Sequence, residues 1–164
     1  MISASERFSS GFADSAVNDL FGTVDVYIHD TPVSGWNGPL TGSPEELATT
    51  LDTVCYGFTL VVDELLADLR ESGGTVILNG GEFSRWIARE MAEQLAPNGV
   101  HVAHVVIDGW VDDESVSEEV PDKKRADPDI LADEFLHLVE QDPDVWSFDV
   151  EFRPYGDDAF RTWR

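Results

Sequence analysis

Lysine and cysteine are nearly absent from this chain of 164 residues. The only lysines are the adjacent Lys123 and Lys124, and Cys55 is the only cysteine. A single cysteine excludes an intramolecular disulfide, which fits an intracellular location. The sequence also has no apolar run of about 20 residues, the length that a transmembrane helix needs. Its first ten residues do not have the pattern of a secretory signal peptide. We therefore expect a cytoplasmic protein.

Positive charge is scarce as well. Ten Lys and Arg residues stand against 33 Asp and Glu residues, which gives a net charge of −23. The acidic residues are spread over predicted helix faces and loops, and the densest run, 112–129, has only the length of a loop. This distribution favours a halophilic protein, because screening over roughly 3 Å in molar salt suppresses self-repulsion. A functional acidic surface is the alternative. In both cases the charge argues against nucleic acid and anionic membranes as direct partners.

The apolar residues predict an α/β fold. The hydrophobic share of 42% is ordinary for a globular protein, and the length suits one domain, residues 1–164. Helices and strands alternate along the chain, beginning with a helix, and their predicted ranges are 10–21, 24–30, 44–71, 75–79, 82–96, 100–107, 127–142 and 146–153. Strands that are apolar throughout indicate a parallel sheet covered by helices. We expect a truncated, Rossmann-like three-layer fold with about four mainly parallel strands, and an irregular acidic loop at 111–126.

Local signals support these boundaries. Ser43, Pro44 and Glu46 form the pattern of a helix start, with a capping serine, a proline in the first turn and a glutamate three residues after the cap. Gly73 and Gly74 end the long helix that follows, and Gly99 closes the next one. The last predicted strand, 146–153, alternates apolar and polar residues, which predicts a position at the edge of the sheet or near an assembly surface.

Four stretches of the sequence resemble one enzyme family. They are DLFGTVDVYIHDT (19–31), SGGTVILNGG (72–81), EMAEQLAPNGVHVAHVVIDGWV (90–111) and DPDILADEFLHLVEQDPDVWSFDVEFRPYGDDAF (127–160). In their order and spacing they are similar to the short-chain dehydrogenase/reductase family, from the end of its third strand–helix unit to its C-terminus. The resemblance covers roughly residues 10–160. It implies the Rossmann-like fold and, in a complete member, an NAD(P)-dependent oxidoreductase.

The motifs that carry the family's chemistry are missing from this sequence. It contains no Gly-x-Gly-x-x-Gly, the turn that holds the cofactor pyrophosphate at a helix N-terminus. It contains no Tyr-x-x-x-Lys, and the family's catalytic Asn corresponds to Val54. The serine region reads Asn79-Gly80-Gly81, and the family's Asn-Asn-Ala-Gly is replaced by the segment 29–32. No residue is therefore assigned a catalytic role.

These losses lead to a functional expectation with two alternatives. We expect a non-catalytic homologue, a pseudoenzyme that uses no cofactor and acts as an assembly or regulatory subunit or scaffold. The first alternative is an NAD(P)-dependent oxidoreductase, completed by a partner chain that supplies the missing half. The second is a protein that binds a small ligand.

A ligand cleft is the candidate site. Ligands of open α/β sheets bind at the carboxyl ends of the strands, and five residues follow or end the predicted strands: His29, Asp30, Asn79, Gly80 and Asp108. The alternative is that these residues only form turns. No metal site is expected, because His101 and His104 are three residues apart on a strand and point to opposite faces. We interpret Cys55 as a buried structural thiol, and Ser84 lacks the sequence signature of a nucleophile.

The resemblance also implies an oligomer. In this family the helices that correspond to 44–71 and 82–96 commonly pack against a partner, and bulky residues are available on them: Tyr56, Phe58, Phe83, Trp86 and Ile87. The expected partner is a second copy or a full-length relative. A sheet that lacks half of the family's strands also exposes an edge and an apolar face, which a partner would cover.

Overall fold

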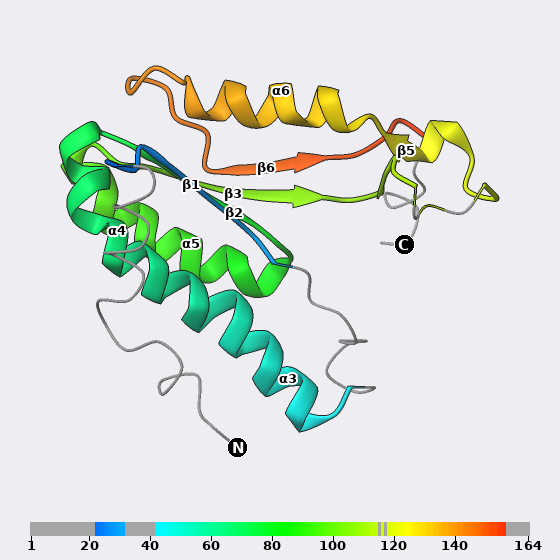
Figure 1. Cartoon of the computed structure of the whole chain (residues 1–164), viewed down its shortest axis with the longest axis horizontal. Coiled ribbons are helices and arrows are strands. Elements are labelled where there is room, and N and C mark those ends of the chain that lie inside the picture. The colour runs from blue at the N-terminus through cyan, green and yellow to red at the C-terminus, as the bar shows by residue number, and fades with distance from the viewer. Residues whose placement is uncertain (1–21, 32–41, 115, 117, 157–164) are drawn as a thin grey trace.

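A four-stranded parallel sheet forms the centre of the protein. The computed structural model describes residues 22–31, 42–114, 116 and 118–156, so the helix predicted at 10–21 lies outside the described residues. The strands lie side by side in the order β1 (Val26–Asp30), β2 (Thr75–Asn79), β3 (His101–Ile107) and β6 (Asp149–Phe152), and all neighbours are parallel. Figure 1 shows α6 on one side of this sheet and α3, α4 and α5 on the other. The predicted three-layer α/β fold is therefore confirmed.

The long helix predicted at 44–71 is interrupted. It consists of α3 (Pro44–Leu51), a π-helical stretch (Asp52–Gly57) and α4 (Phe58–Ser72). The predicted start is confirmed, since Ser43 and Glu46 form a reciprocal capping box. Around the π-helical stretch, threonine hydroxyls donate to carbonyls four residues earlier, a contact that tends to bend helices. These threonines are Thr49, Thr50, Thr53 and Thr59.

Glycine ends two of the helices as predicted. Gly73 caps α4 in the left-handed region, with φ 65°. The helix α5 (Glu82–Leu95) continues into a 3-10 turn (Ala96–Asn98), which ends at Gly99 with φ 78°. A residue without a Cβ atom adopts these dihedral angles at no steric cost. Both turns lead directly into buried strands, β2 and β3, and so fix where the sheet begins.

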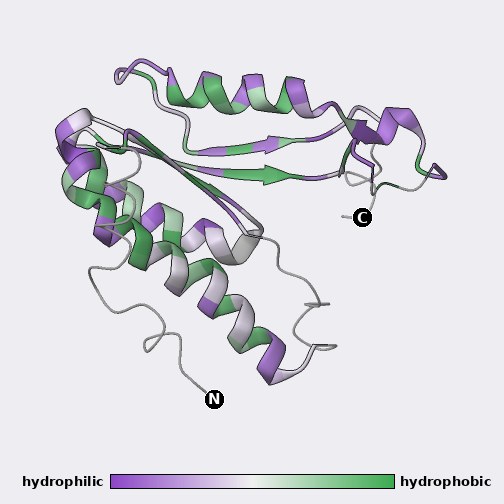
Figure 2. Cartoon of the chain, in the orientation of Figure 1, coloured by the Kyte–Doolittle hydropathy of each residue, from purple (hydrophilic) through white to green (hydrophobic). Residues whose placement is uncertain are grey.

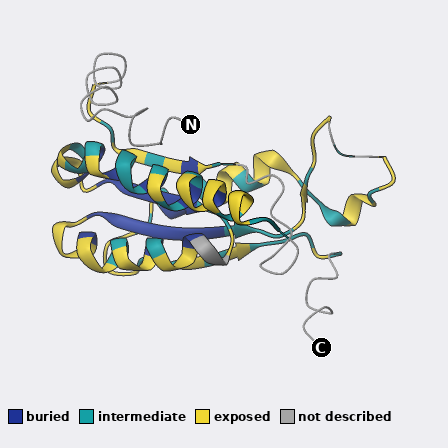
Figure 3. Ribbon diagram, turned by 90° about the horizontal axis from the view of Figure 1, so that it is seen from below, coloured by how far each residue is buried: buried dark blue, intermediate teal, exposed yellow. Residues whose placement is uncertain are grey.

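Two apolar clusters form the core, one on each face of the sheet. The larger lies under α4 and α5 and includes Phe58, Leu69 and Leu78, all fully buried. The smaller lies under α6, where Ile77 and Leu138 belong to the buried residues. Successive residues of a strand point to opposite faces, which is why Ile77 and Leu78 join different clusters. Figure 2 shows apolar residues along the strands, and Figure 3 shows the most buried segments between two layers of helices whose outer turns are exposed.

The segment 111–126, predicted as an irregular loop, contains some regular structure. Two short strands, β4 (Trp110–Val111) and β5 (Arg125–Ala126), pair in parallel, and a 3-10 turn (Asp122–Lys124) precedes β5. The chain then enters α6 (Pro128–Val139), whose N-cap is Asp127. Among the described strands, β6 lies at an edge of the sheet, which agrees with the expectation from its alternating pattern. Among the described residues, no helix combines the length and apolar character needed to cross a membrane.

Candidate functional site

The carboxyl ends of the strands bring two of the predicted site residues together. Asp30 ends β1, Asn79 ends β2, and the two are paired in the register of the sheet. The Asn79 side-chain amide donates to Oδ1 of Asp30 over 2.9 Å. Asp30 is exposed and Asn79 is half-buried. This pair presents a carboxylate and an amide at the edge where open α/β sheets bind ligands, and both groups can hydrogen-bond hydroxyl or amide groups.

His29 points into the protein, on the face of the sheet opposite to that of Asp30. Its side chain is buried, with its ring 5.4 Å from the ring of Phe58. Nδ1 of His29 lies 2.7 Å from the Tyr27 hydroxyl, and Nε2 lies 3.2 Å from the Thr31 hydroxyl. His29 therefore connects β1 to the helix layer and does not line an open cleft with Asp30.

Burial sets the charge states of His29 and Tyr27. Desolvation lowers the pKa of His29 and outweighs the raising effects of a backbone hydrogen bond at Thr53 and of the Asp30 charge. Burial also raises the pKa of Tyr27 to about 12. Both side chains are consequently neutral near pH 7, so the contact between the Tyr27 hydroxyl and Nδ1 of His29 is a hydrogen bond between two uncharged groups. A phenol with so high a pKa is a poor proton donor for catalysis.

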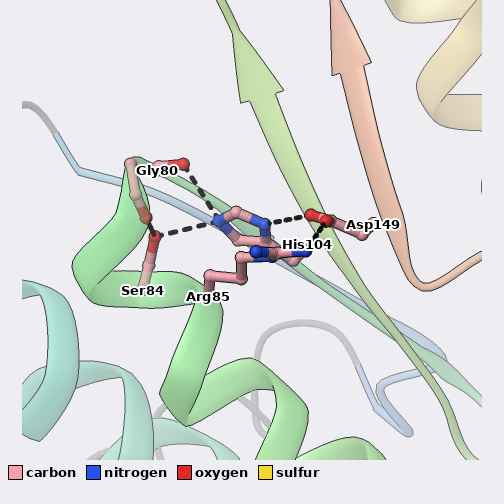
Figure 4. Close-up of polar contacts among 6 residues, drawn as sticks. Gly80, Ser84, Arg85, His104 and Asp149 are labelled. Atoms are coloured by element: carbon pink, nitrogen blue, oxygen red, sulfur yellow. Dashed lines mark hydrogen bonds and ion pairs between the residues drawn. The ribbon is translucent and has the colours of Figure 1, made fainter.

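A second polar network surrounds Gly80 and was not predicted from the sequence. Nδ1 of His104 lies 2.8 Å from Oδ1 of Asp149, and Nε2 lies 3.0 Å from the Gly80 carbonyl and 3.2 Å from the Ser84 hydroxyl. Arg85 pairs with the other oxygen of Asp149 at 2.6 Å. Figure 4 shows the His104 ring between these groups, which come from the turn after β2, from α5, and from strands β3 and β6.

The contacts run from Ser84 through His104 to Asp149, which is the order of the residues in a catalytic triad. Their geometry, however, indicates a structural role and not a catalytic one. The Ser84 side chain is fully buried, and its hydroxyl donates to the Gly81 carbonyl over 2.5 Å. A nucleophile must reach its substrate and give its proton to the histidine, and Ser84 does neither. The network instead ties the turn between β2 and α5 to the last strand. Burial raises the pKa of Asp149, but the hydrogen bonds from His104 and Arg85 outweigh this effect, and that pKa lies below its usual value.

The other two residues of the predicted cleft belong to separate contacts. The Gly80 carbonyl is held by His104, as described above. Asp108, after β3, accepts a hydrogen bond from Arg153 over 2.8 Å, and Arg153 also pairs with Glu151. The structure thus unites only Asp30 and Asn79 of the five predicted residues.

The histidines of β3 lie on opposite faces, as expected. His101 stacks on Trp146, with ring centroids 5.1 Å apart, and its Nε2 lies 2.7 Å from the Ser147 carbonyl. His104 faces α5 and the Gly80 turn. In the part of the chain that the structure describes, no cluster of three or more His, Cys, Asp or Glu residues could hold a metal ion. Burial raises the pKa of the half-buried Cys55 thiol, which disfavours a reactive thiolate.

The residues expected at an oligomer interface have different environments. Trp86 is 66% exposed on α5, and Tyr56 is 39% exposed in the π-helical stretch. Ile87 is half-buried against the larger core cluster. Phe58 is fully buried in that cluster, so it packs the sheet and is not available at a surface. The side chain of Phe83 lies outside the described residues.

Comparisons with known proteins identify the architecture. No protein-family model and no curated protein sequence matches this chain. Among solved structures, the alcohol dehydrogenase from the archaeon Thermococcus sibiricus, complexed with 5-hydroxy-NADP, is 18% identical, with a TM-score of 0.69 over 88% of this chain and 68% of that one. L-sorbose reductase from Gluconobacter frateurii, complexed with NADPH and L-sorbose, is 14% identical, with a TM-score of 0.70 over 86% of this chain and 69% of that one. A short-chain dehydrogenase from Rhodopseudomonas palustris is 21% identical, with a TM-score of 0.63 over 87% and 69%.

These matches correct one expectation and confirm another. The expectation that no cofactor is used is wrong, because the solved structures that this chain matches include complexes with NADPH and with 5-hydroxy-NADP. The resemblance noted in the sequence is confirmed at the level of the fold, over more than four-fifths of the chain. The chain therefore has the fold of the short-chain dehydrogenase/reductase enzymes, in a shortened form.

Proposed function

We propose that this chain is a component of an NAD(P)-dependent oxidoreductase of the short-chain dehydrogenase type. The observation that carries the proposal is the parallel sheet of that enzyme fold, with the Asp30–Asn79 pair at its carboxyl edge. Matched structures that contain NADPH or 5-hydroxy-NADP support a nicotinamide cofactor. The cofactor would supply hydride transfer when bound.

The described residues fit one half of such a cofactor. The Asp30 carboxylate and the Asn79 amide offer the hydrogen-bond acceptor and donor that ribose hydroxyls and a carboxamide require. The pyrophosphate half needs backbone N–H groups at a Gly-rich turn, and the sequence contains no Gly-x-Gly-x-x-Gly. We therefore assign Asp30 and Asn79 to the nicotinamide–ribose half and assign the pyrophosphate contacts to a partner chain.

A non-catalytic subunit that binds NAD(P) is the second candidate function. It is favoured by the short connection between β2 and α5, where Gly80 and Gly81 stand in place of the segment that carries Tyr-x-x-x-Lys in the family. The turn is held by His104 and Ser84, and these buried side chains do not face a substrate. Such a subunit would bind the cofactor and regulate or assemble with a full-length relative. NAD(P)H oxidation with a panel of carbonyl compounds separates the two candidates, since only the first predicts turnover.

Both candidate functions require that the protein binds NADPH. The experiment that tests this binding is a titration with NADPH in molar KCl, followed by energy transfer from tryptophan. Trp110, which begins β4 shortly after the end of β3 and is 55% exposed, is a reporter near this edge. We expect saturable binding near the millimolar range for the chain alone, which corresponds to about −4 kcal/mol. Replacing both Asp30 and Asn79 by alanine should weaken it about tenfold, because each hydrogen bond contributes about 0.5–1.5 kcal/mol.

The matched control is Asp63→Ala, which removes one exposed carboxylate from α4. It should leave the affinity unchanged. Equal weakening in the control and the double variant would show that net charge, rather than the carboxyl edge, governs binding. A titration without saturable signal would contradict the proposed function itself.

The cellular environment of this protein and its assembly with a further chain are also proposals. The net charge of −23 supports a cytoplasm of high ionic strength, where the repulsion between acidic side chains is screened. The exposed Trp86 and Tyr56 side chains support assembly with a further chain through the helix layer.

A further inference from the structure

The partners of the buried His104 ring determine how many protons it carries. A neutral imidazole donates from one ring nitrogen and accepts at the other, whereas an imidazolium donates from both. The Gly80 carbonyl, 3.0 Å from Nε2 of His104, can only accept a hydrogen bond. Ser84 lies 3.2 Å from the same nitrogen, but its hydroxyl already gives its proton to the Gly81 carbonyl. Nε2 therefore carries a proton.

The other nitrogen of this ring also faces an acceptor. Nδ1 of His104 lies 2.8 Å from Oδ1 of Asp149, and Arg85 contacts the second carboxylate oxygen at 2.6 Å (Figure 4). Burial raises the pKa of Asp149, but the hydrogen bonds from His104 and Arg85 outweigh burial and keep that pKa below its usual value. Asp149 is thus ionised near neutral pH and has no proton to donate. Nδ1 carries the second proton, and the ring is an imidazolium.

The surroundings of the ring compensate for the burial of this positive charge. The His104 side chain is only 1% exposed, and an unpaired cation at this depth would be costly. Here both N–H groups have acceptors, and the Asp149 carboxylate lies at hydrogen-bond distance, where water screens the attraction weakly. Such a pair stabilises only as long as both partners are charged. The protonation of His104 is therefore coupled to the packing of the strands around it.

Among the described side chains, few other charged groups face this ring. Its neighbour in register on β2 is the apolar Leu78. One turn after Arg85 on α5, Arg89 is engaged in an ion pair with Glu93. His101, on the same strand as the ring, points to the opposite face of the sheet. The ion pair described above is thus the main influence on the charge of the ring.

The same ring holds the turn next to the candidate site. Asn79, which pairs with Asp30, is followed directly by Gly80. The Gly80 N–H donates to the Val105 carbonyl over 2.9 Å, and the Gly80 carbonyl accepts from His104. Both backbone polar groups of this glycine are thus fixed to β3.

Loss of one proton from His104 leaves a single N–H group for two acceptors. The remaining proton stays with Asp149, because a hydrogen bond to a charged group is the stronger one. Nε2 then presents a bare lone pair to the Gly80 carbonyl, and two acceptors at 3.0 Å repel each other. The turn after β2 must shift, and the Asn79 side chain shifts with it.

We propose that His104 is a buried imidazolium whose second proton holds the turn after β2 and so makes the candidate NADPH edge sensitive to pH. In the doubly protonated state the turn is fixed, and Asn79 lies beside Asp30. At higher pH the ring loses a proton, the Gly80 carbonyl is released, and the edge binds NADPH more weakly. The effect on NADPH rests on the proposed function, whereas the protonation of the ring does not.

This proton also contributes to stability. An unfolded histidine has a pKa of about 6.5 and is largely neutral above that value, while the folded His104 ring keeps both protons. The stabilisation is therefore complete below about pH 6.5 and is lost as the pH rises and the folded ring gives up its second proton. The direction is opposite to that expected for the buried, neutral His29.

The first test observes the ring protons and needs no cofactor. NMR of the ¹⁵N-labelled full chain in molar KCl correlates each histidine ring nitrogen with its protons, from about pH 6 to about pH 9. We expect both nitrogens of His104 to be protonated at neutral pH and one proton to be lost toward the upper limit, together with shifts of the Gly80 and Gly81 amides. His104→Gln assigns the signals, and the exposed His137 is the reference ring. A bare ring nitrogen at neutral pH, or amides that do not respond, overturns the proposal.

The second test removes the need for the second proton. In Asp149→Asn the new amide can donate to a bare Nδ1, so Nε2 keeps its proton for the Gly80 carbonyl at every pH. The affinity of the parent for NADPH should fall about tenfold between about pH 7 and about pH 9, the effect of one hydrogen bond, and that of Asp149→Asn should stay constant. Asp133→Asn, which removes an exposed carboxylate from α6, should respond as the parent does.

The outcomes separate this proposal from the proposed function. Equal pH dependence in Asp149→Asn and Asp133→Asn overturns the control of the edge by His104 and leaves NADPH binding intact. Absence of NADPH binding at every pH contradicts the proposed function, and the ring protons then decide alone whether His104 holds the turn.

Discussion

Replacing His104 by alanine should destabilise the protein more than any other single histidine substitution in β3 or α6. The ring is buried and contacts three elements: Asp149 of β6, the Gly80 carbonyl and the Ser84 hydroxyl. Hydrogen bonds to charged groups contribute about 1.5–3 kcal/mol, and an unsatisfied buried carbonyl costs about 1–3 kcal/mol. Asp149 is 36% exposed and keeps Arg85, so the larger cost of a broken buried ion pair does not apply. We expect a loss of about 3 kcal/mol.

The assay is urea unfolding in molar KCl, followed by tryptophan fluorescence, with thermal unfolding as a second readout. A change of about 3 kcal/mol corresponds to a fall in Tm of about 6–12 °C for a domain of this size. His137→Ala, on the exposed side of α6, is the control and should stay within about 0.5 kcal/mol of the parent.

A double-mutant cycle identifies the interaction. His104→Ala and Asp149→Asn should show a coupling energy of about 1–2 kcal/mol, since the two groups are in direct contact. The coupling should persist from low to high salt, because screening acts weakly on a buried hydrogen bond. A loss below about 1 kcal/mol for His104→Ala, or a coupling of zero, would refute the view that this network holds the β2–α5 turn to β6.

Three further predictions concern charge and reactivity. Burial lowers the pKa of His29 in the folded protein, so the stabilising contribution of its neutral side chain is present above the unfolded pKa of about 6.5 and is lost as the pH falls below that value. His29→Gln should therefore flatten the dependence of the unfolding free energy on pH between about 7 and 5. An unchanged slope would contradict this prediction. With a net charge of −23, Tm should rise as KCl is raised from 0.1 M to about 2 M, and a constant or falling Tm would show that self-repulsion is unimportant. Ser84 should not react with a fluorophosphonate probe in the folded protein, because its side chain is fully buried; labelling that Ser84→Ala abolishes would establish a nucleophile there.

Most of the fold followed from local patterns. Apolar runs identified the strands, and glycines at 73 and 99 identified the ends of helices, because each signal resides in a few adjacent residues. The capping box at Ser43 was predicted for the same reason. The π-helical stretch at 52–57 was not, since it depends on threonine hydroxyls bonding back to carbonyls within an otherwise helical pattern. The β4–β5 pair was missed because each strand has only two residues.

The candidate site was predictable only in part. The position of Asp30 and Asn79 at adjacent strand ends follows from a parallel sheet, and the sequence indicated both. The direction of the His29 side chain depends on the alternation within β1 and on contacts with Tyr27 and Phe58, so its burial did not follow from its place at a strand end. The His104 network joins residues 20 and 45 positions apart in the chain. Such contacts are determined by the packing of strands and helices, and no sequence spacing indicates them.

NMR mapping of the NADPH-binding residues tests most directly the proposal that this chain is a component of an NAD(P)-dependent oxidoreductase. The ¹⁵N-labelled chain is titrated with NADPH in molar KCl, and the shifts of its backbone amides are followed. The proposed function predicts saturable shifts at the carboxyl edge, at Thr31, Asn79, Gly80 and Gly81, with little change in α6. Amides that do not shift at millimolar NADPH, or shifts that gather away from this edge, would contradict a role in an NAD(P)-dependent oxidoreductase.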